Sequence, residues 1–435
     1  MKKHKNIMIQ GTGSSVGKTL IVAGLCRIFA QDGYRVSPFK SQNMALNSFV
    51  DIEGLELSRG TVIQAEAGYE IPRAFMNPIL LKPNSDNNSQ VIINGKVAYT
   101  ADAKNYFLRS KELKKIALET YKNNIENNFD IAVLEGGGSP AEINLREYDL
   151  VNMGMAELVD SPVILVGNID IGGVFAAIYG TVMLLDENDR KRIKGYIINK
   201  FRGDRDLLKP AIEILDKKFK DEGLDIRFLG VLPYADLKIE EEDSLSDEDK
   251  RVYSNDKKYI NISVIKTKKM SNFTDFHAFK QYDDVRVKYI YDVKDLGDED
   301  IIIFPGSKNT ITDLEDLKKK GIFEKVKELK EKGKIIIGIC GGLQMLGKKI
   351  HDPKHLESDI LETEGFNFFD YKTTFNEIKK TEQVIKKIEV TEGILKNFNG
   401  YKIKGYEIHQ GVTNILTPII CKDNVFATYI HGIFD

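Results

Sequence analysis

The first candidate for chemistry in this sequence is a cysteine between an apolar run and two glycines. Cys340 follows the run 335–339, a predicted buried strand, and precedes Gly341-Gly342 and a helical pattern beginning at Leu343. Such a turn places a side chain at a helix N-terminus, where the helix dipole and free N–H groups favour a thiolate. The nucleophile of serine hydrolases occupies the same layout. We therefore predict that Cys340 is a nucleophile. The alternative, a buried core cysteine, leaves the flanking glycines unexplained.

A second candidate is the glycine-rich segment Gly11–Thr19, which reads Gly-Thr-Gly-Ser-Ser-Val-Gly-Lys-Thr. It lies between a predicted strand at 6–10 and a predicted helix at 20–31, the context of a P-loop. Its backbone N–H groups would hold phosphates, Lys18 would reach the β and γ oxygens, and the Thr19 hydroxyl would bind Mg²⁺. The predicted nucleotide-binding residues here are Gly13, Val16, Gly17, Lys18 and Thr19. The first glycine, Gly11, stands one position earlier than usual, and a chance glycine-rich turn is the alternative.

Amide and hydroxyl side chains follow the next predicted strand in the string Lys40–Ser48, Lys-Ser-Gln-Asn-Met-Ala-Leu-Asn-Ser. In open α/β sheets, ligands bind beyond the carboxyl ends of the strands. Neutral amides suit a substrate with many carboxylates and amides, and Lys40 would offset the charge of a carboxylate or acyl phosphate. An Asn- and Ser-rich turn explains the same residues, and the residues alone do not decide between the two.

The elements that carry these residues form two α/β domains. We expect a P-loop parallel-sheet domain at 1–240, an acidic linker at 241–257, and a second domain at 258–435. Predicted strands of the first domain also include 131–135, 163–167, 196–198 and 228–232, with a helix at 113–121. Those of the second are 260–265, 286–291, 301–304 and 335–339.

Composition supports an ordinary globular protein and excludes several classes. The 435 residues are 42% hydrophobic and 29% charged, with a net charge of −2, which gives no electrostatic case for nucleic acid or an anionic membrane. No apolar run is long enough to span a bilayer, and no signal peptide is recognisable. Three unpatterned cysteines fit a reducing cytosol, so a cytoplasmic protein is expected.

Several motifs together resemble known enzymes. The loop Gly11–Thr19 is similar to that of dethiobiotin synthetase and its relatives, which use ATP to activate a carboxylate. Together with Lys40–Ser48, Gln64–Ala67 and Met76–Pro83, it makes the chain resemble the cobyric acid synthase family. These are glutamine-dependent amidotransferases of corrinoid biosynthesis. The resemblance runs from Ile7 to Phe434, and Lys40–Ser48 is its most specific part.

The resemblance implies roles in the first domain. Glu135, at the end of a buried strand, would be a metal-associated carboxylate beside Thr19. Arg146 and Asp149 would handle the substrate carboxylate, with Asp149 as a general base for incoming ammonia, although a solvated helix start explains the same charges. Asn199 resembles the asparagine that recognises adenine. The family usually has Asp and Arg where this chain has Asn168 and Ile171, so no role is assigned to those two positions.

For the second domain the resemblance implies a flavodoxin-like class I glutaminase. His431 stands where such enzymes place the catalytic histidine, and His409, the competitor, is expected to be structural or near the domain interface. The glutamate that usually follows two residues later is replaced by Ile433, so we predict a Cys–His pair with no third member assigned. Backbone N–H groups of Gly306 and Gly341 are predicted to form the oxyanion hole.

The chain ends at Asp435, where relatives usually continue with a helical segment. We therefore expect a truncated sequence, a frayed strand at His431 and impaired glutaminase activity.

The activity implied is glutamine- and ATP·Mg²⁺-dependent amidation of the b, d, e and g carboxylates of adenosylcobyrinic acid a,c-diamide, which gives adenosylcobyric acid. Cobyrinic acid a,c-diamide synthase is the nearest alternative, but it usually has a different string at Lys40–Ser48. A cell-wall lipid amidotransferase subunit would match the second domain only. A partitioning or regulatory P-loop ATPase would leave Cys340 unexplained. The order of amidations, the route of ammonia and the oligomeric state stay open.

Overall fold

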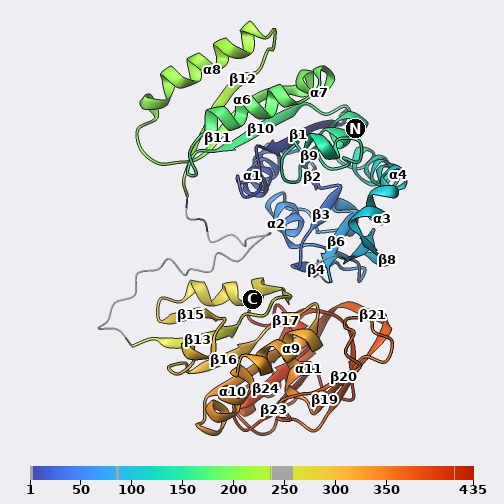
Figure 1. Cartoon of the computed structure of the whole chain (residues 1–435), viewed down its shortest axis with the longest axis vertical. Coiled ribbons are helices and arrows are strands. Elements are labelled where there is room, and N and C mark those ends of the chain that lie inside the picture. The colour runs from blue at the N-terminus through green and yellow to red at the C-terminus, as the bar shows by residue number, and fades with distance from the viewer. Residues whose placement is uncertain (1–2, 85–87, 236, 238–257, 416) are drawn as a thin grey trace. The chain divides into compact units, whose positions relative to one another are not determined.

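The computed structural model describes residues 3–84, 88–235, 237, 258–415 and 417–435. The chain folds into two compact units, and each is described separately (Figure 1). Unit 1 contains residues 1–44, 57–81 and 90–239, and unit 2 contains residues 45–56, 82–89 and 240–435. The predicted acidic linker at 241–257 lies outside the described residues. None of the described helices is both long enough and apolar enough to cross a membrane.

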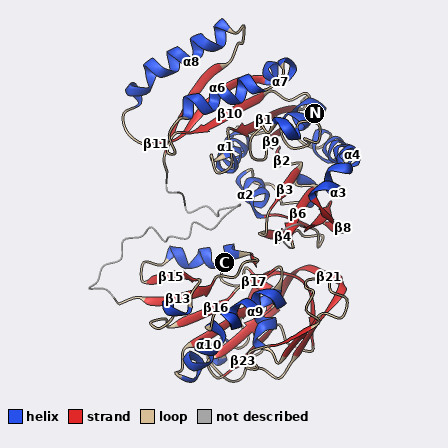
Figure 2. Cartoon of the chain, in the orientation of Figure 1, coloured by secondary structure: helices blue, strands red, loops and turns tan. Residues whose placement is uncertain are grey.

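Unit 1 is built on a six-stranded parallel sheet in the order β12-β11-β10-β1-β9-β2. Side chains alternate between its two faces. Met8 and Leu134 pack into one apolar cluster, whereas Ile9 and Val133 pack into another, so both faces are buried. Helices flank the strands accordingly (Figure 2). The strands are β1 (Lys5–Gly11), β2 (Val36–Phe39), β9 (Ile131–Glu135), β10 (Val163–Asn168), β11 (Ile193–Phe201) and β12 (Arg227–Pro233).

The helices of unit 1 follow the strands as expected for parallel connections. The first, α1, begins after the glycine-rich loop, and the predicted helices at 20–31 and 113–121 are confirmed within a few residues. The α-helices are α1 (Lys18–Gln31), α2 (Arg59–Ala67), α3 (Ala103–Leu108), α4 (Ser110–Thr120), α5 (Met153–Leu158), α6 (Val174–Leu184), α7 (Glu187–Arg192) and α8 (Lys209–Asp221).

Two small sheets are inserted between β2 and α3. One has the order β3-β6-β7-β8, and the other pairs β4 with β5. These strands are β3 (Gln42–Met44), β4 (Ser48–Val50), β5 (Glu56–Ser58), β6 (Ile79–Pro83), β7 (Asn88–Ile93) and β8 (Lys96–Asp102). They include residues of unit 1 and residues of unit 2, so this insertion contributes to both.

Unit 2 has a six-stranded sheet in the order β15-β13-β16-β18-β24-β23, parallel except for β23. Its strands are β13 (Ile260–Ile265), β15 (Val285–Ile290), β16 (Ile301–Phe304), β18 (Ile335–Ile339), β23 (Ile419–Lys422) and β24 (Val425–Thr428). The four predicted strands of this domain are confirmed. The helices are α9 (Thr310–Lys319), α10 (Ile322–Glu331) and α11 (Gly341–Leu346). A 3₁₀ segment, Phe273–Gln281, precedes β15.

A second, five-stranded sheet of unit 2 has the order β20-β19-β21-β22-β25. Its strands are β19 (Lys349–His351), β20 (Glu362–Glu364), β21 (Lys372–Lys387), β22 (Lys402–Thr413) and β25 (Ile430–His431). The short strands β14 (Met270–Ser271) and β17 (Gly306–Ser307) pair separately. Both sheets contribute strand ends around Cys340.

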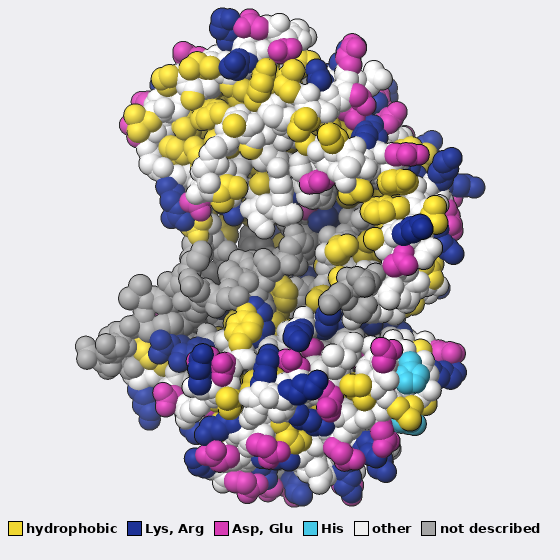
Figure 3. Space-filling view, in the orientation of Figure 1, with side chains coloured by type: hydrophobic (Ala, Val, Ile, Leu, Met, Phe, Trp, Pro, Cys, Tyr) yellow, Lys and Arg dark blue, Asp and Glu magenta, His cyan; other side chains and the backbone are white. Residues whose placement is uncertain are grey.

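The two units differ in the surface that each presents in Figure 3. Hydrophobic side chains gather near the region of α8 and β12 in unit 1, where Leu207, Ile214 and Leu229 are exposed. Over unit 2, Lys and Arg are interspersed with Asp and Glu. Mixed charges of this kind are typical of a solvated surface.

Candidate active sites

Cys340 occupies a strained turn between β18 and α11. Its backbone has φ 52° and ψ −105°, a region that side-chain-bearing residues rarely adopt. Strain of this kind is concentrated at functional sites. The next residues must be small, because a Cβ on Gly342 would lie 2.0 Å from the carbonyl oxygen of Phe304. The predicted elbow is therefore present, and its glycines allow α11 to pack closely against β16.

The histidine beside Cys340 is His431, and it is held by a carboxylate that sequence reasoning did not find. His431 Nδ1 lies 2.7 Å from Asp275 Oδ2, and both side chains are almost fully buried. The other carboxylate oxygen, Oδ1, accepts a hydrogen bond of 2.9 Å from the backbone N–H of Gly432. Asp275 thus fixes the imidazole and the end of β25 together. It leaves Nε2 available toward the thiol.

The electrostatics of this group favour a protonated imidazole. Burial acts to lower the pKa of His431, but Asp275 and Cys340 outweigh burial and raise it from 6.5 to about 10. A protonated imidazole beside a cysteine favours the thiolate, which is the nucleophilic form. The site therefore brings together a thiol, an imidazole and a carboxylate, and their roles as nucleophile, proton carrier and orienting group stay predictions.

The expected fraying of the His431 strand is wrong. His431 is 1% exposed, and β25 pairs with β22 through Tyr406 and Glu407. His409 is engaged elsewhere, as predicted for a structural residue. Its Nδ1 lies 2.7 Å from the carbonyl of Gly411, and its Nε2 lies 3.3 Å from Glu407.

The predicted oxyanion glycines both lie next to the nucleophile and its base. A Cβ on Gly306 would lie 3.1 Å from Cε1 of His431, and a Cβ on Gly341 would lie 2.7 Å from the backbone nitrogen of Ser307. Two loops that carry backbone N–H groups therefore converge beside Cys340. Their use as an oxyanion hole stays a prediction.

In unit 1, the loop before α1 has the features of a phosphate site. Gly17 has φ 98° at the N-terminus of α1, a conformation that favours glycine. Lys18 Nζ donates to the carbonyls of Gly13 at 2.9 Å and Gly138 at 3.1 Å. These carbonyls keep the ammonium over the loop, where a phosphate would replace them as its partner.

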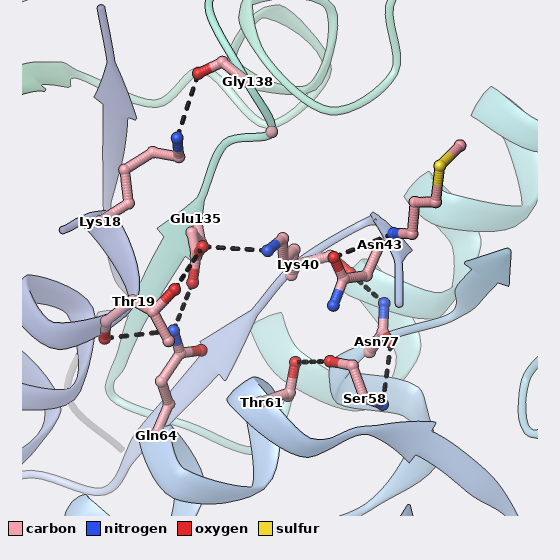
Figure 4. Close-up of polar contacts among 12 residues, drawn as sticks. Lys18, Thr19, Lys40, Asn43, Ser58, Thr61, Gln64, Asn77, Glu135 and Gly138 are labelled. Carbon is pink, nitrogen blue, oxygen red and sulfur yellow. Dashed lines mark hydrogen bonds and ion pairs between the residues drawn. The ribbon is translucent and has the colours of Figure 1, made fainter. Parts of the chain in front are cut away.

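Glu135 is hydrogen-bonded to the other polar side chains of this site, as Figure 4 shows. Its carboxylate is 2% exposed and accepts from Thr19 Oγ1 at 3.0 Å, from Lys40 Nζ at 3.0 Å and from Gln64 Nε2. Asn77 supports Lys40 by donating to its backbone carbonyl at 2.9 Å. The predicted residues Thr19, Lys40 and Glu135 are therefore brought together, and Gln64 joins them.

The donor set fits Mg²⁺. Thr19 and Glu135 present hard oxygen ligands within 3.0 Å of one another, and Mg²⁺ commonly takes only one or two protein oxygens, with phosphates and waters completing the octahedron. The described residues contain no cluster of three or more His, Cys, Asp or Glu side chains that could hold an ion alone. Phosphate oxygens of a bound nucleotide would complete the coordination of a metal at Thr19 and Glu135.

Comparison with known proteins now decides the family. Residues 7–245 match the model of the CobQ/CobB/MinD/ParA nucleotide binding domain, and residues 261–435 match the CobB/CobQ-like glutamine amidotransferase domain. The chain is 48% identical to the cobyric acid synthase of Clostridium botulinum, over 99% of this chain and 88% of that protein. It belongs to the cobyric acid synthase family. The relatives from Clostridium novyi and Alkaliphilus metalliredigens are 48% and 49% identical, over 100% and 98% of this chain and 87% and 88% of theirs.

As a member of the cobyric acid synthase family, the chain is a glutamine-dependent amidotransferase of cobalamin biosynthesis. It combines a P-loop nucleotide-binding domain with a glutamine amidotransferase domain, the predicted α/β fold class. Its substrates at the level of the family are glutamine and a corrinoid.

Asp149 and Arg146, which were predicted to handle the substrate carboxylate, are hydrogen-bonded within this cobyric acid synthase family member. Asp149 accepts three backbone N–H bonds at the start of α5, from Val151, Asn152 and Gly154, at 2.9, 2.8 and 2.7 Å. Arg146 makes two bonds to Asp189, at 2.6 and 2.9 Å. Both carboxylate oxygens of Asp149 are thus engaged by the backbone at the start of α5. Its role as a general base stays a prediction.

Asn199 lies at the P-loop, but its amide is used there. Nδ2 donates to the carbonyl of Val16 at 2.8 Å, and Oδ1 accepts from the N–H of Lys200 at 2.8 Å. Recognition of adenine by Asn199 stays a prediction, and it requires this amide to exchange partners when a nucleotide binds.

The string Lys40–Ser48 has two sets of partners. Lys40 contacts Glu135 in unit 1. In unit 2, Asn47 Oδ1 accepts from the N–H of Phe273 at 3.0 Å, and the Ser48 carbonyl accepts from Asn272 Nδ2 at 3.0 Å. The last residues of the string therefore support the segment that carries Asp275. No local sequence signal indicated this role.

Proposed function

We propose that this enzyme uses ATP·Mg²⁺ to activate the b, d, e and g carboxylates of adenosylcobyrinic acid a,c-diamide, and that ammonia from glutamine converts them to amides. The observation that carries this proposal is the convergence of Thr19, Lys40 and Gln64 on the buried Glu135, beside Lys18 of the P-loop. A site of this kind suits transfer of a phosphoryl group to a carboxylate.

Activation is needed because ammonia and a free carboxylate form only a salt. A carboxylate oxygen attacks the γ-phosphorus of ATP, ADP leaves, and an acyl phosphate forms. Ammonia then forms the C–N bond while the C–O bond to phosphate breaks, and a proton leaves the nitrogen. Lys18 would bind the transferred phosphoryl group, Thr19 and Glu135 would hold Mg²⁺, and Lys40 would offset charge on the acyl phosphate. Bound Mg²⁺ would neutralise part of the phosphate charge.

Ammonia would come from the site of Cys340. The thiolate attacks the amide carbon of glutamine, and His431 donates a proton to the leaving nitrogen. The resulting thioester is hydrolysed by water, with His431 accepting a proton, and glutamate is released. Asp275 keeps the imidazole oriented through both steps.

Mass spectrometry of the corrinoid product tests the proposal. Incubation of the a,c-diamide with ATP, Mg²⁺ and glutamine should give four successive carboxylate-to-amide conversions, and omission of ATP should give none. Conversion of unamidated cobyrinic acid without conversion of the a,c-diamide would contradict the proposal and favour cobyrinic acid a,c-diamide synthase. Amidation without ATP would refute the nucleotide role.

A further inference from the structure

The cavity beside Cys340 is more highly charged than the amide of glutamine requires. Its volume is about 40 Å³, and it is partly open to solvent. Besides Cys340 and Gly341, its lining includes three lysines, Lys82, Lys308 and Lys379, and the carboxylate of Glu357. Charged groups beside a cysteine nucleophile call for an explanation, because each loses hydration there.

Two of the three lysines are neutralised within the protein. Lys82 Nζ and Lys379 Nζ each lie 2.5 Å from one oxygen of Glu56, which is 1% exposed. Burial acts to raise the pKa of Glu56, but the two lysines hold it at about 2. Within the described part of the chain, the ammonium of Lys308 has no ion-pair partner closer than 4 Å. Burial lowers the pKa of Lys308, so an anionic partner is needed to keep its ammonium charged.

The position of Glu357 is fixed by hydrogen bonds within the described part of the chain, but only one of its two carboxylate oxygens takes part in them. One carboxylate oxygen accepts from the N–H of Thr310 at 3.0 Å, and the buried Asp352 accepts from the N–H of Glu357 at 2.8 Å. The second carboxylate oxygen has no hydrogen-bond partner among the described residues. Burial raises the pKa of Glu357 to about 7, so a cation is needed to keep it charged. The positive charge of Lys308 acts to lower the pKa of Glu357, and the negative charge of Glu357 acts to raise the pKa of Lys308.

The buried side-chain amide of Gln344, in the same cavity, has an oxygen that requires a hydrogen-bond donor. Gln344 is 2% exposed, and its Oε1 has no hydrogen-bond partner among the described residues. Cys340, Lys308, Glu357 and Gln344 thus surround a space that presents one unpaired cation and two acceptors without donors. An α-amino acid has the complementary groups, an ammonium and a carboxylate on one carbon.

We propose that Glu357 binds the α-ammonium of glutamine and that Lys308 binds its α-carboxylate, which places the γ-amide at Cys340. These two residues would select glutamine over other amides. The inference concerns the glutamine site only and does not depend on the ATP step.

Steady-state kinetics with two matched analogues test the proposal. Glutaramate lacks the α-ammonium of glutamine, and 4-aminobutanamide lacks its α-carboxylate. For Glu357→Gln, whose amide oxygen still accepts from Thr310, we expect KM for glutamine to rise about 10- to 100-fold with little change in kcat. Its kcat/KM for glutaramate should be nearly unchanged. Lys308→Met should show the corresponding pattern with 4-aminobutanamide.

A labelling experiment separates recognition from folding and thiol reactivity. 6-Diazo-5-oxo-norleucine carries the α-amino acid group and alkylates the nucleophile, whereas iodoacetamide carries no charge. Glu357→Gln and Lys308→Met should slow labelling of Cys340 by the first reagent at least tenfold and leave labelling by the second unchanged. The exposed pair Lys354→Met and Glu377→Gln serves as the matched control, with both rates unchanged.

The proposal is overturned if the Glu357→Gln variant loses kcat/KM equally with glutamine and glutaramate. It is also overturned if the variants slow the labelling of Cys340 equally with both reagents. Either result would assign Glu357 to the support of α9 and the loop at Asp352, with no part in binding glutamine.

Discussion

At the scale of single residues, Asp275 links the His431 side chain to the end of β25. Its two carboxylate oxygens hold the His431 ring and the Gly432 backbone, so one side chain sets both the orientation and the protonation of the base. The glutamate usual in class I glutaminases would be at Ile433. Here the carboxylate comes from a 3₁₀ segment far away in the sequence.

Asp275→Asn should impair glutamine hydrolysis while preserving the fold. Asparagine can still accept from Gly432, but it does not stabilise the imidazolium. We expect kcat for glutaminase activity to fall roughly 10²- to 10⁴-fold. Amidation with free ammonia should be unchanged, and the exposed Asp298→Asn is the control. Unchanged glutamine turnover would show that Asp275 is not required.

The same variant should change the pH at which the His431 ring titrates, followed by its NMR signal. Its pKa of about 10 in the folded enzyme is above 6.5, so the pair stabilises the fold fully below pH 6.5 and loses this effect as pH rises through about 10. Without Asp275, titration should move toward 6.5. A midpoint that stays near 10 would contradict the role of the carboxylate.

Sequence reasoning placed Cys340, His431, Lys18 and Glu135 in candidate sites, because each lies in a motif or at the end of a buried strand. It assigned no role to Asp275, because 156 residues separate Asp275 from His431 and no spacing rule connects them. It also assigned chemistry to Asp149, whose backbone partners depend on the local path of the chain.

At the scale of elements, the segment Ala45–Glu56 is part of unit 2 although it precedes α2 of unit 1. Val50 packs with Tyr406 and Ile408, and the Val50 carbonyl accepts from Gln383 at 2.9 Å. The segment ends at Glu56, which bridges Lys82 and Lys379. A segment from the first half of the sequence thus holds two of the lysines that line the cavity beside Cys340.

Glu56→Gln should destabilise unit 2, because it leaves two buried lysines facing each other without a counter-charge. Loss of one partner from a buried ion pair costs about 3 to 5 kcal/mol. Denaturant unfolding of the full chain would measure the loss. Glu53→Gln, exposed on the same turn, should change stability by less than about 0.5 kcal/mol. Equal stabilities of the two variants would contradict the prediction.

The pH dependence of the Glu56 contribution has the opposite sign from that of His431. The folded-state pKa of about 2 lies below the ordinary value of 4.5. Its stabilising effect is therefore complete above pH 4.5 and is lost as pH falls through about 2.

Apolar runs predicted most strands of the two six-stranded sheets, because the central strands are buried on both faces. The long strands β21 and β22 were not predicted. The side chains of β21 are mostly exposed and rich in Lys and Glu, and β22 is partly buried but mixes apolar residues with Lys, Gly, Glu, His and Gln. Neither hydrophobic alternation nor a continuous apolar run therefore marks these strands. Their pairing depends on tertiary context.

At the scale of the whole molecule, two chemical steps are assigned to residues in different units. Lys18 and Glu135 belong to unit 1, and Cys340, His431 and Asp275 belong to unit 2. Each step can therefore be removed separately if the proposed scheme is correct.

Reciprocal variants test this division. Cys340→Ala should abolish amidation with glutamine and retain amidation with free ammonia, because only the nitrogen source is lost. Lys18→Ala should abolish amidation with either source and retain measurable glutaminase turnover. Product assays with both nitrogen sources measure each effect. Loss of ammonia-dependent amidation in Cys340→Ala, or full amidation by Lys18→Ala, would contradict the scheme.

The sharing of Lys40–Ser48 between Glu135 and the Asp275 segment limits how this enzyme can be rearranged by recombination. A chimaera that joins the first 240 residues to a foreign glutaminase would carry Asn47, Ser48 and Glu56 without their partners at Phe273, Asn272 and Lys379. Functional exchange would need residues 45–56 and 82–89 to travel with the glutaminase. The exchangeable module is therefore discontinuous in the gene, although each domain family matches an uninterrupted stretch of the chain.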